Sequence, residues 1–253
     1  METGAITGYI DVAQVTLYVF WLFFAGLVFW LRREDKREGY PLVTEIPGQR
    51  VEGFPPLPAE KTYLLAHGGT LTTPRLDPPE PSFDAVPTAS WPGAPLQPLG
   101  NPMLSRVGPA AYAIRSDGPD LEYETNGPRI LPLRVKTDHF IDPEGPDPRG
   151  MEVVGADGVV AGVISDIWID LTEMTVRYLE MTLAAGPSVL IPGPMVRTTG
   201  GKVLVQSITA AQFADVPLLA NPDIITLNEE EKIQAYFAGG QLYAEPSRLE
   251  PLL

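Results

Sequence analysis

The chain begins with one long apolar stretch. Residues 12–31 carry no formal charge, and Gln14 and Thr16 are the only strongly polar side chains among them. At about 1.5 Å of rise per residue, a helix of this length covers the roughly 30 Å hydrocarbon core of a bilayer. A cleaved signal peptide fits less well, because residues 1–11 are acidic and no small-residue cleavage site follows the stretch. The pattern therefore predicts one transmembrane helix over residues 12–31.

Residues 32–150 follow a different pattern, in which proline recurs. Of the 28 prolines in the chain, 21 lie between residues 41 and 150. Proline lacks a backbone donor and fixes φ, so long helices and central strands are excluded there. Apolar side chains nevertheless recur throughout the segment. We expect an extended chain with turns, ordered by docking on another surface, with disorder as the alternative.

The pattern changes to that of strands over residues 151–253. Residues 159–170 are rich in β-branched and aromatic side chains, and the turn signal Asp157-Gly158 precedes them. Residues 176–183 are predicted to form the antiparallel partner strand. Further short strands are predicted at residues 188–191, 195–197 and 202–205. Short strands with tight turns predict a small antiparallel barrel, closed or nearly closed.

Short C-terminal helices are expected to complete this mainly β domain. Asn228 is the predicted N-cap of one helix, and three glutamates at 229–231 fall in its first turn. The helix dipole favours acidic side chains there, so we prefer this interpretation of the glutamates to a metal site. Gly239-Gly240 is expected to end the helix.

Charge orients the chain and limits its partners. Arg32, Arg33, Lys36 and Arg37 follow the apolar stretch, whereas no lysine or arginine precedes it. The positive-inside rule therefore predicts an external N-terminus and a cytoplasmic segment 32–253, with the basic residues at the lipid head groups. The net charge of −14 disfavours a nucleic-acid partner.

The sequence gives little sign of enzymatic chemistry. Cysteine is absent, which excludes a disulfide framework, a thiolate metal site and a thiol nucleophile. The two histidines, His67 and His139, are far apart in the sequence and are not expected to bind a metal. Phosphate loops, dinucleotide-binding turns and hydrolase motifs are also absent. These absences do not exclude an enzyme anchored by one span, but the sequence suggests no particular enzymatic reaction.

Several short motifs together resemble one protein family. They are FWLFFAGL at 20–27, REGYPL at 37–42, NPM at 101–103, GPA at 108–110, DPRG at 147–150, DIWID at 166–170, FADVP at 213–217 and YFAGG at 236–240. In this order they resemble the H subunit of the purple-bacterial photosynthetic reaction centre, whose soluble module is the PRC barrel. The resemblance extends over almost the whole chain.

This resemblance implies a non-catalytic subunit that binds no pigment itself. Its partners would be the L and M subunits, which hold bacteriochlorophyll, bacteriopheophytin, quinones and a non-haem iron. The H subunit would stabilise that core and assist proton transfer from the cytoplasm to the secondary quinone during light-driven electron transport. Whether a light-harvesting ring or a cytochrome subunit joins the complex stays open. The alternative is a membrane-tethered PRC-barrel adaptor or assembly protein outside the pigment complex.

The resemblance also implies a location and a division of the chain. The location is the bacterial inner (intracytoplasmic) membrane, which the chain crosses once and where it contacts lipids. Residues 1–11 would be periplasmic, residues 12–31 would span the membrane, and residues 32–150 would run over the cytoplasmic face. Residues 151–253 would form the cytoplasmic PRC-like barrel with its C-terminal helix.

Carboxylates near the end of the long predicted strand are candidate proton carriers. Asp170 and Glu173 lie three positions apart, and a hairpin would bring Arg177 near Asp170. Burial and neighbouring negative charge raise a carboxyl pKa towards neutrality, which suits proton transfer. The resemblance implies that the pair lies near the secondary quinone and that Glu173 matters more. The alternative is a pair of ordinary turn carboxylates with an arginine partner, worth about 0–1 kcal/mol.

The chain departs from the family where protons are taken up. Some family members have a histidine pair in the stretch that corresponds to residues 121–127, and this chain has no histidine there. Glu122 and Glu124 are the candidate proton collectors in its place. His139 and Asp142 mark an alternative point of uptake.

Overall fold

The computed structural model describes residues 4–43, 50–66, 68–74, 84–91, 93–183 and 186–249. His67 lies outside these residues, so its predicted lack of a metal-binding role stays a prediction. The chain divides into two compact units, Met1–Glu80 and Pro81–Leu253, and each is described by itself. The predicted boundary at residue 150 between an extended segment and a barrel also stays a prediction.

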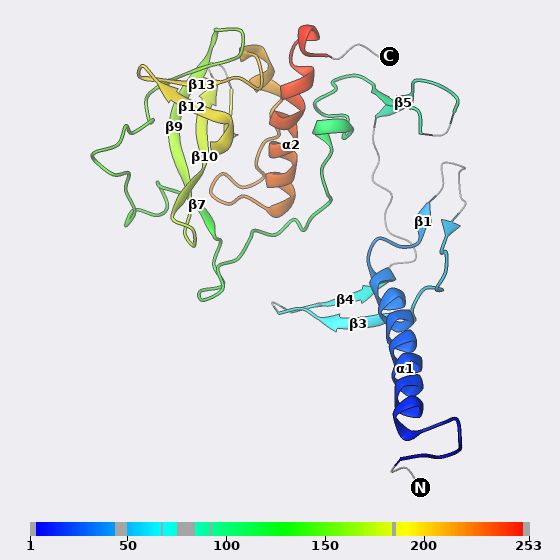
Figure 1. Ribbon diagram of the computed structural model, residues 1–253. Coiled ribbons are helices and arrows are strands. Elements are labelled where there is room, and N and C mark those ends of the chain that lie inside the picture. The colour runs from blue at the N-terminus through cyan, green and yellow to red at the C-terminus, as the bar shows by residue number, and fades with distance from the viewer. Residues whose placement is uncertain are drawn as a thin grey trace. The chain divides into compact units, whose positions relative to one another are not determined.

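Helix α1 (Val12–Glu34) dominates the first unit (Figure 1). It begins at Asp11, whose carboxylate accepts a hydrogen bond of 2.7 Å from the Gln14 backbone, while Gln14 Oε1 accepts from the Asp11 N–H. None of its residues is buried within the chain. Val12–Arg37 is long and apolar enough to cross a membrane. The predicted transmembrane helix is confirmed in its start and is three residues longer at its end.

Two of the basic residues after this helix fold back onto the chain. Lys36 is buried, and its Nζ donates to the carbonyls of Glu52 at 2.6 Å and Pro55 at 2.5 Å. Arg37 donates to Glu34 and to the Ala59 carbonyl at 2.8 Å. These two cations therefore hold the segment that follows the helix, in addition to any contact with lipid head groups.

Before β7 (Ile130–Pro132), the described residues of the proline-rich segment form only two-stranded sheets. The pairs are β1 (Leu42–Val43) with β2 (Arg50–Val51), β3 (Lys61–Leu64) with β4 (Thr70–Thr73), and β5 (Ala85–Pro87) with β6 (Leu96–Pro98). Frequent proline explains why these strands stay short and paired only in twos.

The short 3-10 helices among the described residues are η1 (Asp35–Arg37), η2 (Gly108–Ala110), η3 (Gly193–Met195), η4 (Ala210–Asp215) and η5 (Pro246–Arg248).

A seven-stranded sheet forms the body of the second unit, in the order β11-β10-β9-β8-β13-β12 with β7 also paired to β9. The strands are β7 (Ile130–Pro132), β8 (Glu152–Val154), β9 (Val160–Asp170), β10 (Thr175–Leu183), β11 (Ser188–Pro192), β12 (Val196–Thr199) and β13 (Lys202–Val205). The predicted β domain and its long hairpin, β9 with β10, are confirmed. The prediction that all strand pairs of the barrel are antiparallel is wrong for one pair, because β13 and β8 run parallel.

Strand β9 is long enough to pair with two strands along one edge. Its first part pairs with β8 and its last three residues pair with β7, while β10 runs along the other edge. The β7 pairing places Ile130 opposite Asp170. A segment of the proline-rich region thereby reaches the end of β9, where the predicted site residues lie.

Helix α2 (Leu227–Tyr243) lies beside the sheet and closes the core (Figure 1). The largest fully buried side chains come from the sheet, from η4 and from α2: Trp168, Tyr178, Phe213, Tyr236 and Phe237. The predicted N-cap at Asn228 is wrong, because Thr226 caps the helix through a bond from the Glu229 N–H to Thr226 Oγ1 of 3.2 Å. The Glu229 side chain in turn accepts from the Thr226 N–H at 2.8 Å.

The helix also runs through Gly239 and Gly240, which were expected to end it. Both glycines face tightly packed neighbours. A Cβ at Gly239 would lie 2.9 Å from Ala110 Cβ, and one at Gly240 would lie 2.5 Å from the Ser207 carbonyl oxygen. Close approach of the helix to the chain, rather than termination, therefore explains the glycine pair.

Candidate functional site

Arg129 gathers three carboxylates at the end of β9. It directly precedes β7, so the pairing of Ile130 with Asp170 brings its side chain to that carboxylate. Arg129 Nε donates to Asp170 Oδ1 at 2.9 Å, and Nη2 lies 2.8 Å from Asp170 Oδ2. The same guanidinium is 2.8 Å from Glu173 Oε1 and 3.3 Å from Asp120 Oδ2. One positive charge thus faces three negative charges.

Asp170 is the buried member of this cluster, with only 1% of its side chain exposed. Its Oδ1 also accepts from the backbone N–H groups of Thr172 and Glu173, each at 3.0 Å. Burial alone would raise the pKa of Asp170, but the bonds from Arg129 and these two N–H groups outweigh it, so the pKa is lowered. The lowered pKa favours the ionised form of Asp170, which holds the turn through the Thr172 and Glu173 N–H groups, and its predicted part in proton transfer stays a prediction.

Glu173 is the exposed member, with 55% of its side chain accessible. It lies in the turn between β9 and β10, and its carboxylate is held by Arg129. Because Asp170 also bonds to the Glu173 backbone N–H, both the main chain and the side chain of Glu173 are positioned. The exposed Glu173 carboxylate and the buried Asp170 carboxylate are therefore held by the same Arg129 guanidinium.

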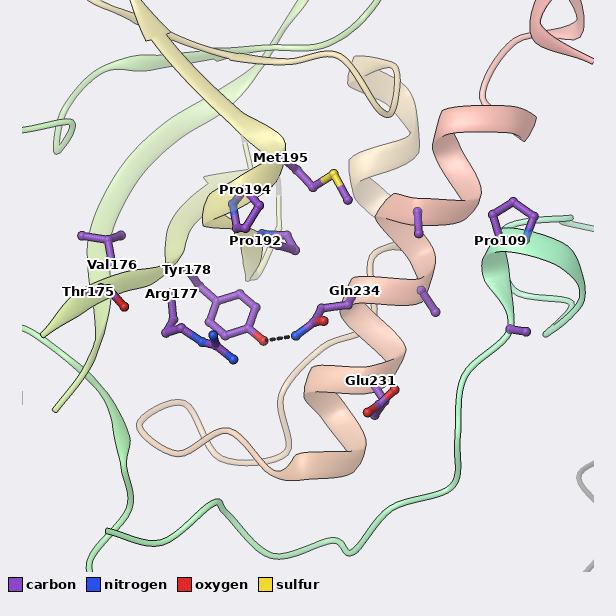
Figure 2. A pocket seen from close by; sticks show the side chains of 13 residues that line it. Pro109, Thr175, Val176, Arg177, Tyr178, Pro192, Pro194, Met195, Glu231 and Gln234 are labelled. Carbon is purple, nitrogen blue, oxygen red and sulfur yellow. Dashed lines mark hydrogen bonds between the residues drawn. The ribbon is translucent and has the colours of Figure 1, made fainter. Parts of the chain in front are cut away.

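A second buried carboxylate, Glu230, lies in the first turn of α2. Its Oε2 accepts from the Tyr178 hydroxyl at 2.8 Å, and Arg177 Nη2 lies 3.8 Å away. Gln234 Nε2 donates to the same hydroxyl at 3.0 Å (Figure 2). The side chains of β10 and α2 therefore meet in a short chain of polar contacts inside the unit.

The electrostatic setting of Glu230 differs from that of Asp170. Burial raises the pKa of Glu230, and the negative charges of Asp120 and Asp170 raise it further. The Tyr178 and Arg177 contacts lower this pKa but do not offset the burial. Burial and the Glu230 charge also raise the pKa of the Tyr178 hydroxyl. Glu230 therefore retains a proton at a higher pH than a free glutamate does.

The three glutamates at the start of α2 have three separate roles. Glu229 caps the helix, and Glu230 accepts from Tyr178 inside the unit. Glu231 forms an ion pair of 2.8 Å with Arg115. The helix dipole favours Glu229 and Glu230, which lie in the first turn, but it does not account for the burial of Glu230. The expectation that Glu231 also lies in the first turn is wrong, because the helix begins at Leu227.

Arg177 does not take the position that the hairpin predicted. A β-bulge separates the pairs Val176–Ile169 and Tyr178–Trp168, so Arg177 has no partner in the ladder opposite it. Its ion pair is with Glu230, whereas the guanidinium on Asp170 belongs to Arg129. Sequence reasoning missed Arg129, whose only local signal is the short apolar run that follows it.

Glu122 and Glu124 lie in a loop whose base leads into the cluster. Asp120 and Arg129 close this loop, with the Arg129 N–H donating to the Asp120 carbonyl at 2.8 Å. Glu122 is half-buried and accepts from the Thr125 hydroxyl at 2.5 Å, whereas Glu124 is exposed. The loop is therefore tied to the site through its backbone and through Asp120.

The alternative point of uptake lies in a separate surface loop. His139 Nδ1 is 3.1 Å from the Asp138 carboxylate, and this hydrogen bond lowers the pKa of Asp138. Asp142 accepts from the Glu144 backbone N–H at 2.9 Å. Within the described ranges, no group of three or more His, Asp or Glu side chains is placed to hold a metal ion.

A second arginine-centred cluster lies at Asp166, in the middle of β9. Arg134 contacts Asp166 at 3.0 Å, Glu180 at 2.6 Å and Asp223 at 2.9 Å. Trp168 Nε1 also donates to Glu180, at 2.9 Å. These contacts join β9, β10 and the segment before α2, so this cluster has a structural explanation.

Comparison with known protein families gives two matches. The family model described as "Photosynthetic reaction centre, H-chain N-terminal region" matches residues 4–135, just over half of the chain. The model described as "PRC-barrel domain" matches residues 144–212. The first match includes α1 and the loop with Glu122 and Glu124, and the second includes the β9–β10 hairpin with Asp170 and Glu173.

Proposed function

Because this chain belongs to the family of photosynthetic reaction-centre H chains, we propose that it stabilises the L–M core and supports proton transfer to the secondary quinone. The chain is a subunit of a photosynthetic reaction centre and associates with the L and M subunits. It is a non-enzymatic subunit that does not itself bind pigment, as its family implies. Helix α1, the one helix among the described residues that is long and apolar enough to cross a membrane, supports a single-pass topology.

The proposed orientation places the N-terminus in the periplasm and the β domain in the cytoplasm of the bacterial inner membrane. Arg32 and Arg33 in the last turn of α1 support it, because basic residues concentrate on the cytoplasmic side of spanning helices. The bacteriochlorophyll, bacteriopheophytin, quinones and non-haem iron of the complex would then be held by L and M.

The observation that carries the proton-transfer proposal is the pairing of an exposed carboxylate with a buried, ionised one on a single arginine. Asp170 stays ionised and holds Arg129, and Arg129 in turn orients Glu173. More than half of the Glu173 side chain is exposed, so its carboxylate is open to water. Ordered water carries a proton between such carboxylates when they lie a few ångströms beyond direct contact.

Glu230 adds a carboxyl group whose raised pKa suits proton storage. It lies within the electrostatic influence of Asp120 and Asp170, so a change of charge at the Arg129 cluster alters its protonation. Quinone reduction to quinol consumes two protons, and a carboxyl group that is protonated nearer neutrality supplies one more readily. Glu122 and Glu124 would collect protons at the loop that leads into the cluster.

The competing function is that of a membrane-tethered adaptor or assembly protein. An absorption spectrum of the complex isolated through this chain in mild detergent separates the two functions. A constitutive subunit co-purifies in stoichiometric amount with near-infrared bacteriochlorophyll and bacteriopheophytin bands that bleach reversibly on a flash. A colourless preparation would contradict the proposed role and favour the adaptor.

A further inference from the structure

One asparagine of this chain lies in a sequence that favours loss of its side-chain amide. The backbone nitrogen that follows an asparagine is able to attack the side-chain carbonyl and close a five-membered ring. The chain has four asparagines, at positions 101, 126, 221 and 228, and the structure describes all of them. Proline follows Asn101 and Asn221, and proline has no N–H to serve as the nucleophile. Asn126 and Asn228 are therefore the candidates.

The structure protects Asn228. It lies in the first turn of α2, and its Nδ2 donates to Asp117 Oδ1 at 2.7 Å. The next backbone nitrogen, that of Glu229, donates to Thr226 Oγ1 at 3.2 Å and so takes part in the helix cap. Ring closure at Asn228 requires the main chain to rotate between Asn228 and Glu229. That rotation would break both the cap and the first turn of the helix.

The surroundings of Asn126 differ in each respect. Its side chain is exposed and has no hydrogen-bond partner among the described residues. The Gly127 N–H donates to the Thr125 hydroxyl at 3.2 Å and not to the main chain. Asn126 lies outside the helices and strands, and two backbone bonds to Glu122, each of 2.9 Å, hold the tip of its loop. Opening such a surface loop costs far less free energy than unwinding a packed helix.

We propose that Asn126 is a site of spontaneous deamidation in the folded chain. The Gly127 amide nitrogen, which no Cβ crowds, loses its proton to water or hydroxide and forms a bond to Asn126 Cγ. The bond from Cγ to Nδ2 then breaks, and Nδ2 takes up a proton and leaves as ammonia. A water molecule opens the resulting succinimide ring at either of its two carbonyls, which gives an aspartate or an isoaspartate. Nothing is oxidised or reduced, and water is the only co-reactant.

Either product changes the loop that ends at Asp120 and Arg129. Both products add a negative charge to a loop that already contains Glu122 and Glu124. Isoaspartate also lengthens the main chain by one atom, because the chain then runs through Cβ and Cγ of residue 126. This extra atom displaces the Gly127 carbonyl from the Glu122 N–H, so the Glu122 amide should exchange its hydrogen faster. The modification depends on the loop alone and not on the proposed function.

Peptide mapping of the full-length chain tests the proposal. The detergent-solubilised chain is incubated at mildly alkaline pH, and trypsin then releases residues 116–129 as one peptide. Mass spectrometry with fragmentation locates the conversion of an amide to a carboxylate at residue 126. We expect progressive loss of the unmodified peptide and two products of equal mass, one of which co-elutes with the peptide from Asn126→Asp. The loss should speed up as the pH rises, because only the deprotonated nitrogen attacks.

The chain supplies its own controls. Asn101, Asn221 and Asn228 should keep their amides in the same samples. Gly127→Ala keeps the asparagine and should slow the loss about tenfold, because the added Cβ crowds the attacking nitrogen and restricts the main chain.

Three results would overturn the proposal. The first is retention of the Asn126 amide in the folded chain, and loss of this amide in urea would then show that the folded loop protects it. The second is aspartate as the sole product, or an unchanged rate in Gly127→Ala, because either excludes the cyclic route. The third is loss of the Asn228 amide at the same rate, which would show that the structure does not single out Asn126.

Discussion

Arg129 and Asp170 are 41 positions apart in the sequence and meet in a two-point contact, with Nε 2.9 Å from Oδ1 and Nη2 2.8 Å from Oδ2. The contact joins the residue before β7, within the proline-rich segment, to the end of β9. It fixes the turn that carries Glu173, because Asp170 also accepts the Glu173 backbone N–H. The orientation of the exposed carboxylate therefore depends on a buried ion pair below it.

Removal of the arginine should destabilise the second unit. Arg129→Gln leaves the Asp170 carboxylate buried without its cation, and we expect the free energy of unfolding to fall by about 2–4 kcal/mol. Urea denaturation of the detergent-solubilised chain, followed by near-ultraviolet circular dichroism, measures the change. Arg129→Lys keeps the charge and should lose less. An unfolding free energy of Arg129→Gln equal to that of the unaltered chain would show that the pair contributes nothing net.

The stability supplied by Asp170 should vanish in acid. Its folded pKa lies below the ordinary value of 3.8, so its ionised form favours folding at higher pH. The difference in unfolding free energy between the unaltered chain and Asp170→Asn should be constant above about pH 5 and shrink as the pH falls through the lowered pKa. Denaturation curves at several pH values measure this difference. A difference that grows in acid would contradict the assigned direction of the shift.

Glu230 should show the opposite dependence. Its folded pKa lies above the ordinary value of 4.5, so the folded state binds the proton more tightly than the unfolded state. As the pH rises above 4.5, the unaltered chain should lose stability relative to Glu230→Gln, whose amide still accepts from Tyr178. Thermal unfolding at a series of pH values compares the two chains. Parallel curves across this range would exclude a raised pKa.

The glycines inside α2 should tolerate no side chain. Alanine usually stabilises an exposed helix position by about 1 kcal/mol relative to glycine. At Gly240 a Cβ would lie 2.5 Å from the Ser207 carbonyl oxygen, so Gly240→Ala should instead destabilise by about 1–3 kcal/mol. Gly26→Ala in α1 is the matched control, because a Cβ there meets nothing within 4 Å. Equal unfolding free energies for both variants would contradict the packing described.

The sequence predicted the features that depend on neighbouring residues. The span over residues 12–31 follows from twenty uncharged positions, and the β9–β10 hairpin follows from two β-rich runs joined by a short connection. Asp170 and Glu173 stand out at the end of one of those runs, but their predicted role in proton transfer came from the family resemblance rather than from the local pattern. Arg129 was not found, because only the pairing of β7 with β9 brings it to Asp170.

The remaining errors have the same physical origin. Gly239-Gly240 resembles a helix end in the sequence, yet contact with Ala110 and Ser207 makes small residues necessary within the helix. The triple glutamate suits any helix N-terminus, so its middle member gives no sign of burial against Tyr178. Contacts between distant segments, rather than local propensity, decide these positions.

The most direct test of the proposed function is the rate of the second electron transfer to the secondary quinone in complexes that carry Glu173→Gln. Glu60→Gln serves as the control, because Glu60 is an exposed carboxylate in the first unit, outside both stretches considered for proton uptake. We predict that Glu173→Gln slows this proton-coupled step about tenfold or more while the complex assembles with its full pigment content. Glu60→Gln should leave the rate unchanged. A rate in Glu173→Gln equal to that of the unaltered complex over a wide pH range would contradict a role for this chain in proton transfer through Glu173.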